Sequence, residues 1–151
     1  MTKYISVTLL IYTTIALLTT SCAHSQDCVD GINKLPMYGG VKKCKEQLEF
    51  DRKFIAEEDK LLSRKESTAH FVKRGWEYLY AKKPDTAMMR FNQAWLLDSL
   101  NADIYWGFAD LLGMQGKFKE SLPFFERSIK LNPKKYKSFA GCLNKLWECV
   151  F

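Results

Sequence analysis

The feature that most constrains the fold of this chain is a repeat of side-chain types at an interval of 34 residues. Large residues recur opposite large ones and small residues opposite small ones at this interval. The matched positions are Phe71, Tyr105 and Phe139; Tyr78, Leu112 and Leu146; Gly75 and Ala109; Ala87 and Ser121; Phe91 and Phe125; Ala94 and Ser128; Leu97 and Leu131. A fixed period of this length indicates a supersecondary unit that stacks on copies of itself, so we expect stacked helix pairs from Thr68 onward.

The order of large and small residues gives a mechanical reason for the pairing. Gly75 lies between Phe71 and Tyr78 on one helix face, and Ala109 has the same setting one period later. A second helix can bring its own small residues, beginning with Ala87, into this notch, and the close approach of the two backbones then sets the angle between the helices. Gly75 and Ala109 are therefore predicted to lie at helix crossings.

Residues 102–135, ADIYWGFADLLGMQGKFKESLPFFERSIKLNPKK, resemble a nearly complete tetratricopeptide repeat. Residues 68–101 resemble a more diverged copy, with Lys82 in place of a glycine before the second helix and Ser99 in place of the terminal proline. Residues 136–151 are similar to a lone first helix, whereas residues 34–67 do not fit the repeat. The resemblance implies an all-α fold of antiparallel helix pairs, stacked as a short α-solenoid between a long N-terminal helix and a C-terminal capping helix.

The resemblance also implies where a partner would bind, because the first helices of such repeats line a concave groove. Positions there that packing does not use are predicted to contact a partner: Val72, Trp76, Tyr80, Asp103, Trp106, Asp110, Met114 and Asn144, with Lys137 beside them. Val72 and Trp76 stand where the family's carboxylate clamp would need Lys and Asn, which disfavours that ligand class. An apolar or aromatic segment of basic character, attracted by Asp103 and Asp110, fits better. The competing interpretation is that Trp76 and Trp106 pack on the N-terminal helix or on each other.

Charge and motif content argue against other functional classes. The net charge is +6, but the basic residues are spread along the chain among acidic ones, whereas a nucleic-acid binder would concentrate them. A solvated surface is the preferred interpretation, with an anionic partner or membrane surface as the alternative. Neither His24 nor His70 has a neighbour arranged for acid–base or nucleophilic chemistry, and the sequence contains no CxxC motif, Cys/His cluster or glycine-rich phosphate loop. We therefore expect no enzymatic activity, cofactor, metal, nucleic acid or small-molecule substrate, and we expect another protein as the partner.

The N-terminal residues 1–21 have the pattern of a secretory signal. Lys3 precedes an uncharged, mostly apolar run from Tyr4 to Leu18. This run of about fifteen residues is too short to cross a bilayer core of ~30 Å comfortably as a helix. Export is therefore predicted.

Two cleavage outcomes remain open. Residues 18–22, LTTSC, resemble a loose lipobox of Bacteroidetes-type bacteria, although Thr19 replaces the usual Leu or Val. Cleavage before Cys22 would put lipid on this cysteine and anchor the protein in a membrane, facing the periplasm or the cell surface. Alternatively, Ala23 and Ser25 fit the small-x-small rule of ordinary signal peptidase, which would release a soluble periplasmic or secreted protein.

The remaining cysteines fit an oxidising compartment. A bridge between Cys28 and Cys44 would close a loop of about 17 residues and stabilise the fold by roughly 3 kcal/mol. If helical, Cys142 and Cys149 would lie about 10 Å apart along one face, too far to bridge each other. Cys142 is interpreted as a buried free thiol.

A long helix is predicted from Val41 to about Lys65, because the segment contains no Gly or Pro and its apolar residues fall near one face. These residues are Val41, Cys44, Leu48, Ile55 and Leu62. A cap on the following repeats is preferred over a membrane-surface helix, because both charge signs mix on the polar face.

The predicted organisation is a signal (1–21), a linker with an ordered loop (22–40), an N-terminal helix (41–66), two repeats (68–101 and 102–135) and a capping helix (136–151). The expected function is that of a cell-envelope adaptor or assembly factor. The alternative is a structural accessory subunit or a self-associating oligomer.

Overall fold

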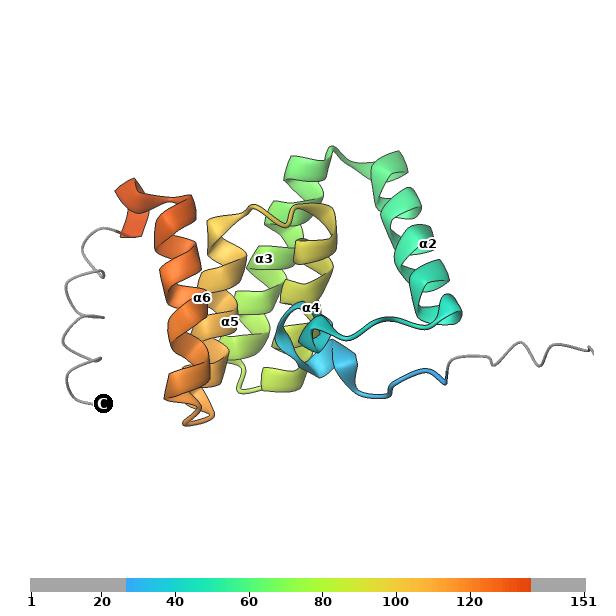
Figure 1. Ribbon diagram of the computed structural model, residues 1–151. Coiled ribbons are helices and arrows are strands. Elements are labelled where there is room, and N and C mark those ends of the chain that lie inside the picture. Colours follow the sequence, from blue (N-terminus) through green and yellow to red (C-terminus); the bar gives the residue numbers. More distant parts are fainter. Residues whose placement is uncertain (1–26, 137–151) are drawn as a thin grey trace, which may run out of the picture.

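The computed structural model describes residues 27–136; the predicted signal, Cys22, Lys137, Asn144, Cys142, Cys149 and almost all of the predicted capping helix lie outside this range. Residues 27–136 form helices and connecting turns, without a strand. The elements are η1 (Ile32–Lys34), η2 (Pro36–Gly40), α2 (Lys45–Leu61), α3 (Arg64–Tyr80), α4 (Pro84–Leu97), α5 (Ala102–Met114) and α6 (Phe118–Leu131). Helices α3 to α6 stand side by side, and α2 stands at one end of the row (Figure 1).

The predicted uninterrupted helix from Val41 to Lys65 is wrong at both ends. Helix α2 begins only at Lys45, and the chain turns extended at Leu62 before α3 begins at Arg64. The break has a local cause: the Ser63 side chain accepts a hydrogen bond from the Glu66 N–H, and the Glu66 carboxylate accepts one from the Ser63 N–H. This capping box starts a new helix without any Gly or Pro. Helix α3 thus begins four residues before Thr68.

The helices pack in pairs, α3 with α4 and α5 with α6, and α5 also contacts both α3 and α4. Phe91 of α4 is fully buried where these contacts meet. A Cβ atom added to Gly75 of α3 would lie 2.7 Å from its ring, and one added to Gly107 of α5 would lie 2.4 Å away. Gly75 therefore lies at a close helix crossing as predicted, and Ala109 is fully buried. The closest approach, however, is at Gly107, which the repeat comparison did not single out.

Most of the other matched positions of the described chain are interior, whereas Tyr78, Phe125 and Leu131 are half-buried. Phe71, Tyr105 and Leu112 are buried, as are the small residues of the second helices: Ala87, Ala94, Ser121 and Ser128. The Ser128 hydroxyl donates a hydrogen bond of 2.8 Å to the carbonyl of Ala102 on the neighbouring helix. The small side chains therefore allow the close contact that the spacing predicted.

The two turns inside the pairs share one backbone conformation. Gly116, in the turn between α5 and α6, has a φ of 75°, and Lys82, one period earlier, has a φ of 56°. The left-handed region is open to glycine but costs an ordinary L-residue roughly 1–2 kcal/mol. Lys82 adopts the turn geometry even though the glycine is missing.

The loop before α2 is held on α4. The Asn92 side-chain amide, buried on α4, donates hydrogen bonds to the carbonyls of Asn33 at 2.9 Å and Leu35 at 2.8 Å. Within η2, Met37 and Tyr38 have φ values of 49° and 58°, which is unfavourable for non-glycine residues. Because Asn92 binds the carbonyls just before this strained turn, it anchors the loop to the helix stack.

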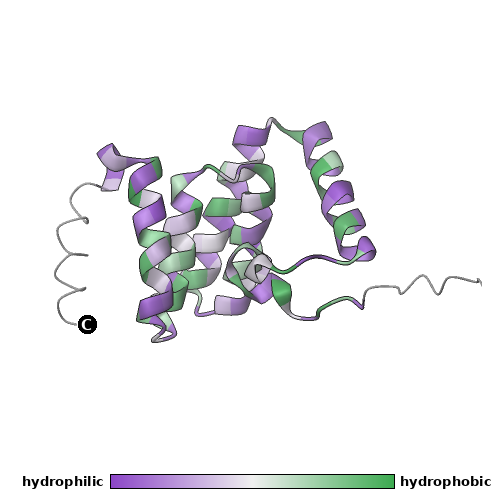
Figure 2. Ribbon diagram, in the orientation of Figure 1, coloured by the Kyte–Doolittle hydropathy of each residue, from purple (hydrophilic) through white to green (hydrophobic). Residues whose placement is uncertain are grey.

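Helix α2 is the least enclosed element. It contains no fully buried residue, and its main ring contact is Phe54, edge-on to Phe71 of α3 with centroids 5.3 Å apart. Phe50 and Leu61 are 76% and 73% exposed. Hydrophobic and hydrophilic residues alternate along its visible side (Figure 2). Packing thus uses only part of the apolar surface of α2.

Candidate functional site

A cavity of about 490 Å³ lies along α3 and the start of α5. Its lining residues are Ala69, Val72, Lys73, Trp76, Glu77, Tyr80, Asn101 and Asp103. Four of the predicted partner-binding residues are therefore together: Val72, Trp76, Tyr80 and Asp103. We call this cavity the α3–α5 groove.

Two aromatic rings form one wall of the α3–α5 groove. Trp76 and Tyr80, one helical turn apart on α3, are stacked with centroids 6.2 Å apart and planes 27° apart. Trp76 also lies edge-on to Phe91 at 5.3 Å, so the core supports its inner side. Tyr80 is 79% exposed. The pair thus joins an anchored ring to an exposed one. In the described chain the rings that contact Trp76 are those of Tyr80 and Phe91, and not rings of α2 or Trp106, which the competing interpretation expected.

Val72 forms the floor of the groove. It is buried and belongs to the core cluster that includes Phe71 and Phe91. Val72 therefore exposes only a small apolar area to the groove, whereas Tyr80 exposes most of its side chain.

The carboxylate of Asp103 is occupied within the fold. The Lys135 ammonium donates to its two oxygens at 2.7 and 2.8 Å, and the Tyr136 hydroxyl donates to one of them. Burial, followed by this hydrogen bond, raises the pKa of Tyr136 above its usual range, so the phenol stays protonated as the donor. Asp103 is thus already compensated by a cation of its own chain.

Trp106 also has partners inside the fold. Its ring stacks on Tyr136, with centroids 4.5 Å apart and planes 8° apart, and lies edge-on to Phe125 at 4.8 Å. Tyr136 is itself buried. Trp106 therefore serves the packing of the chain that follows α6 and presents only part of its surface.

Asp110 and Met114 complete the predicted positions on α5. Asp110 is half-buried, and this burial raises the pKa of its carboxyl. Within residues 27–136 it makes neither a hydrogen bond nor an ion pair. Met114, at the end of α5, is 64% exposed. The remaining predicted residue, Asn144, lies outside the described residues.

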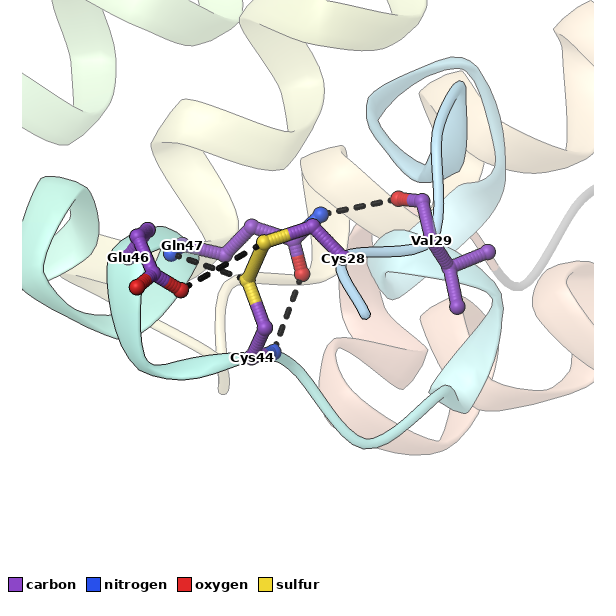
Figure 3. Close-up of a disulfide and its surroundings, with 5 residues drawn as sticks. All are labelled: Cys28, Val29, Cys44, Glu46 and Gln47. Carbon is purple, nitrogen blue, oxygen red and sulfur yellow. Dashed lines mark hydrogen bonds between the residues drawn. A yellow bond between two sulfur atoms is a disulfide. The ribbon is translucent and has the colours of Figure 1, made fainter. Parts of the chain in front are cut away.

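The predicted bridge between Cys28 and Cys44 is present, with Cα atoms 5.1 Å apart (Figure 3). It fastens the loop to the start of α2, where the Cys44 sulfur accepts from the Gln47 N–H and the Gln47 side chain binds the carbonyl of Val29 at 2.8 Å. The Glu46 carboxylate lies beside the sulfurs, but cysteines in a disulfide offer no thiolate to a metal.

A second cavity, of about 420 Å³, lies between this loop, α2 and α4. Lys43 forms an ion pair with Asp51 there and lies 3.1 Å above the ring centroid of Tyr38. Burial, followed by the charge of Asp51, raises the pKa of Tyr38 above its usual range. Lys43 and Asp51 therefore compensate each other's charge in the wall of this cavity.

Sequence reasoning missed three residues that shape the site. Gly107 is off the matched frame, so the period alone did not find it, although a glycine inside a helix is a signal of close approach. Lys135 and Tyr136 follow the helix-breaking Pro133, and no local pattern indicates that they turn back onto Asp103.

Comparison of the chain with protein-family models, with curated proteins and with solved structures finds no match. No helix in the described part of the chain is both long enough and apolar enough to cross a membrane.

Proposed function

We propose that the protein is an exported, non-catalytic interaction module of the tetratricopeptide type, which holds a segment of another protein in the α3–α5 groove. The supporting observation is the stacked pair Trp76 and Tyr80 on the wall of a cavity of about 490 Å³. Aromatic rings of this kind supply contact area to apolar side chains at low conformational cost. An adaptor or assembly factor needs such a surface.

The repeat interpretation is supported by the packing around Phe91. Its ring contacts the backbone of both Gly75 and Gly107, so it joins a helix pair to the first helix of the next pair. This is how stacked repeats bury their faces on neighbours.

Export is supported by the Cys28–Cys44 disulfide, because disulfides persist in oxidising compartments. We propose that the mature protein is lipid-anchored through Cys22, with soluble release after cleavage near Ser25 as the alternative. Mass spectrometry of the mature N-terminus decides between them: an acylated Cys22 supports the anchor, and an unmodified N-terminus at Gln26 contradicts it.

The groove is tested by site-specific photocrosslinking in the native envelope. A photoreactive phenylalanine analogue replaces Tyr80 in one variant and Phe50 in the control, because these side chains are similarly exposed at 79% and 76%. We expect a discrete adduct with another protein from position 80 and none of the same mass from position 50. Identical adduct patterns from both positions would contradict a groove on α3.

The alternative function, a self-associating or accessory structural subunit, is favoured by one observation. Helix α2 leaves Phe50 and Leu61 exposed and buries none of its residues fully. An adduct of twice the chain mass from position 50, with a sedimentation coefficient that rises with protein concentration, would support it. A concentration-independent monomer would exclude self-association.

A further inference from the structure

The two half-buried carboxylates of α5, Asp103 and Asp110, differ in their partners. Asp103 is bound by Lys135 and Tyr136, as described above. Asp110 is half-buried, and no cation or donor of the described chain approaches it. A carboxylate that loses water without gaining a partner is unfavourable in the isolated fold, and a cation supplied by a ligand would compensate it.

The position of Asp110 relates it to the α3–α5 groove. Asp103 and Asp110 are seven residues apart, so they lie on nearly the same face of α5, about 10 Å apart along its axis. Helices α3 and α5 pack together and run in the same direction, because each is joined to the intervening α4 by a short turn. Asp110 is not one of the residues that line the groove, but it lies beyond Asp103 along α5, toward the end at which α3 carries Tyr80.

The acidic residue of α3 in the groove is not available to a ligand in the same way. Glu77 pairs with Arg74 at 2.6 Å and approaches Lys73 at 4.0 Å. The two carboxylates that line the groove, Asp103 and Glu77, thus have a cation of their own. Asp110, which follows on α5, has none within residues 27–136.

We infer that the partner segment carries a lysine or arginine that pairs with Asp110, next to an apolar or aromatic side chain that packs on Trp76 and Tyr80. This inference rests on the proposed groove and adds the chemistry of its ligand. Asp110 acts in it as a specificity-determining residue, and Asp103 does not contribute attraction for a basic ligand.

The probe is a phage-displayed library of random twelve-residue peptides, selected on the protein purified after export of the full chain. Selections run in parallel on the unchanged protein, on Tyr80→Ala and on Asp110→Lys. We expect peptides enriched in a basic residue near an aromatic or aliphatic one on the unchanged protein. The Asp110→Lys variant should lose these peptides and enrich acidic ones.

One selected peptide then serves for affinity measurements by fluorescence anisotropy. Asp110→Asn should weaken binding about tenfold, and replacing the basic residue of the peptide by glutamine should weaken it to the same extent. The two changes together should cost no more than either alone, because they remove the same pair. Glu126→Gln, at an exposed carboxylate of α6, is the matched control and should leave the affinity unchanged.

The outcomes separate the two proposals. Peptides that depend on Tyr80 but show no basic residue, or keep their affinity in Asp110→Asn, overturn the role of Asp110 and leave the groove intact. Failure to select any peptide whose binding depends on Tyr80 overturns the groove, and the ligand chemistry with it.

Discussion

The two helix pairs carry the same pattern of large and small residues, yet they differ in how completely they are enclosed. Phe91 of the first pair is fully buried, with the backbones of Gly75 and Gly107 against its ring. Phe125 of the second pair, one period later, is half-buried and lies edge-on to Trp106. Matched positions are therefore not buried to the same extent in the two pairs, and at Phe91 the burial is completed by Gly107 of the next pair.

The pairs also differ at positions that packing does not use. Trp76 of α3 and Asp110 of α5 are one period apart, so equivalent positions carry an aromatic ring in one pair and a carboxylate in the other. The interior positions are alike because stacking requires it, whereas half-buried positions such as these two are free to diverge. This contrast is expected where interior packing serves the fold and the groove serves recognition.

The largest expected effect concerns Phe91 and Phe125, the matched phenylalanines of the two helix pairs. Phe91→Ala should lower the free energy of unfolding by about 3–5 kcal/mol, because a buried phenylalanine leaves a cavity when truncated. Phe125→Ala should cost roughly half as much, since its side chain is only half-buried. Urea unfolding followed by circular dichroism measures both, and equal losses would contradict the difference in enclosure.

The next effect tests the close approach of the Gly107 backbone to the Phe91 ring. Gly107→Ala should destabilise the protein by about 1–3 kcal/mol, because the new methyl group would overlap the Phe91 ring. Gly113→Ala, in the same helix, meets no atom within 4 Å and should stabilise the protein by about 0.5–1 kcal/mol. The opposite signs are the result to look for in thermal melts, and a stabilising Gly107→Ala would refute the contact.

A smaller effect distinguishes the two turns. Lys82→Gly should raise the free energy of unfolding by about 1 kcal/mol, because glycine tolerates the φ of 56° that strains lysine. Gly116→Lys should lower it by a similar amount for the same reason. If neither substitution changes the urea midpoint, the left-handed geometry does not limit these turns.

The smallest effect concerns Asp110. Burial raises the pKa of its carboxyl in the folded state above the unfolded value of about 3.9, so its ionised form opposes folding. Asp110→Asn should therefore raise the stability at pH 7, by only a few tenths of a kcal/mol because the group is half-exposed and screened. The gain should shrink as the pH falls toward and below about 3.9, where the carboxyl is protonated in both states. A gain that persists at pH 3 would show that the cause is not charge.

The sequence predicts those parts of the fold that depend on periodic packing. Gly75, Ala87 and Ala94 are small because helices approach closely there, so their spacing alone located the first pair. The interruption at Leu62 escaped prediction because a Ser–Glu hydrogen-bond pair competed with helix continuity, and strong helix propensity on both sides masked it.

The groove was only partly predictable for a different reason. The pattern places Trp76, Tyr80 and Asp103 on one surface, and the cavity brings them together. Whether a charge on that surface is available depends on contacts between residues distant along the chain, such as the pair of Asp103 with Lys135. No local sequence pattern encodes such a pair.

The attachment of the N-terminal loop to α4 has a consequence for orientation. At 100° per residue, Met89 and Gln93, which border the loop cavity, lie roughly 160–200° around α4 from Phe91, which faces α3 and α5. The described loop therefore lies on the side of α4 that faces away from α3 and α5. A support that held the protein at this loop would leave the α3–α5 groove, on the other side of α4, open to solvent.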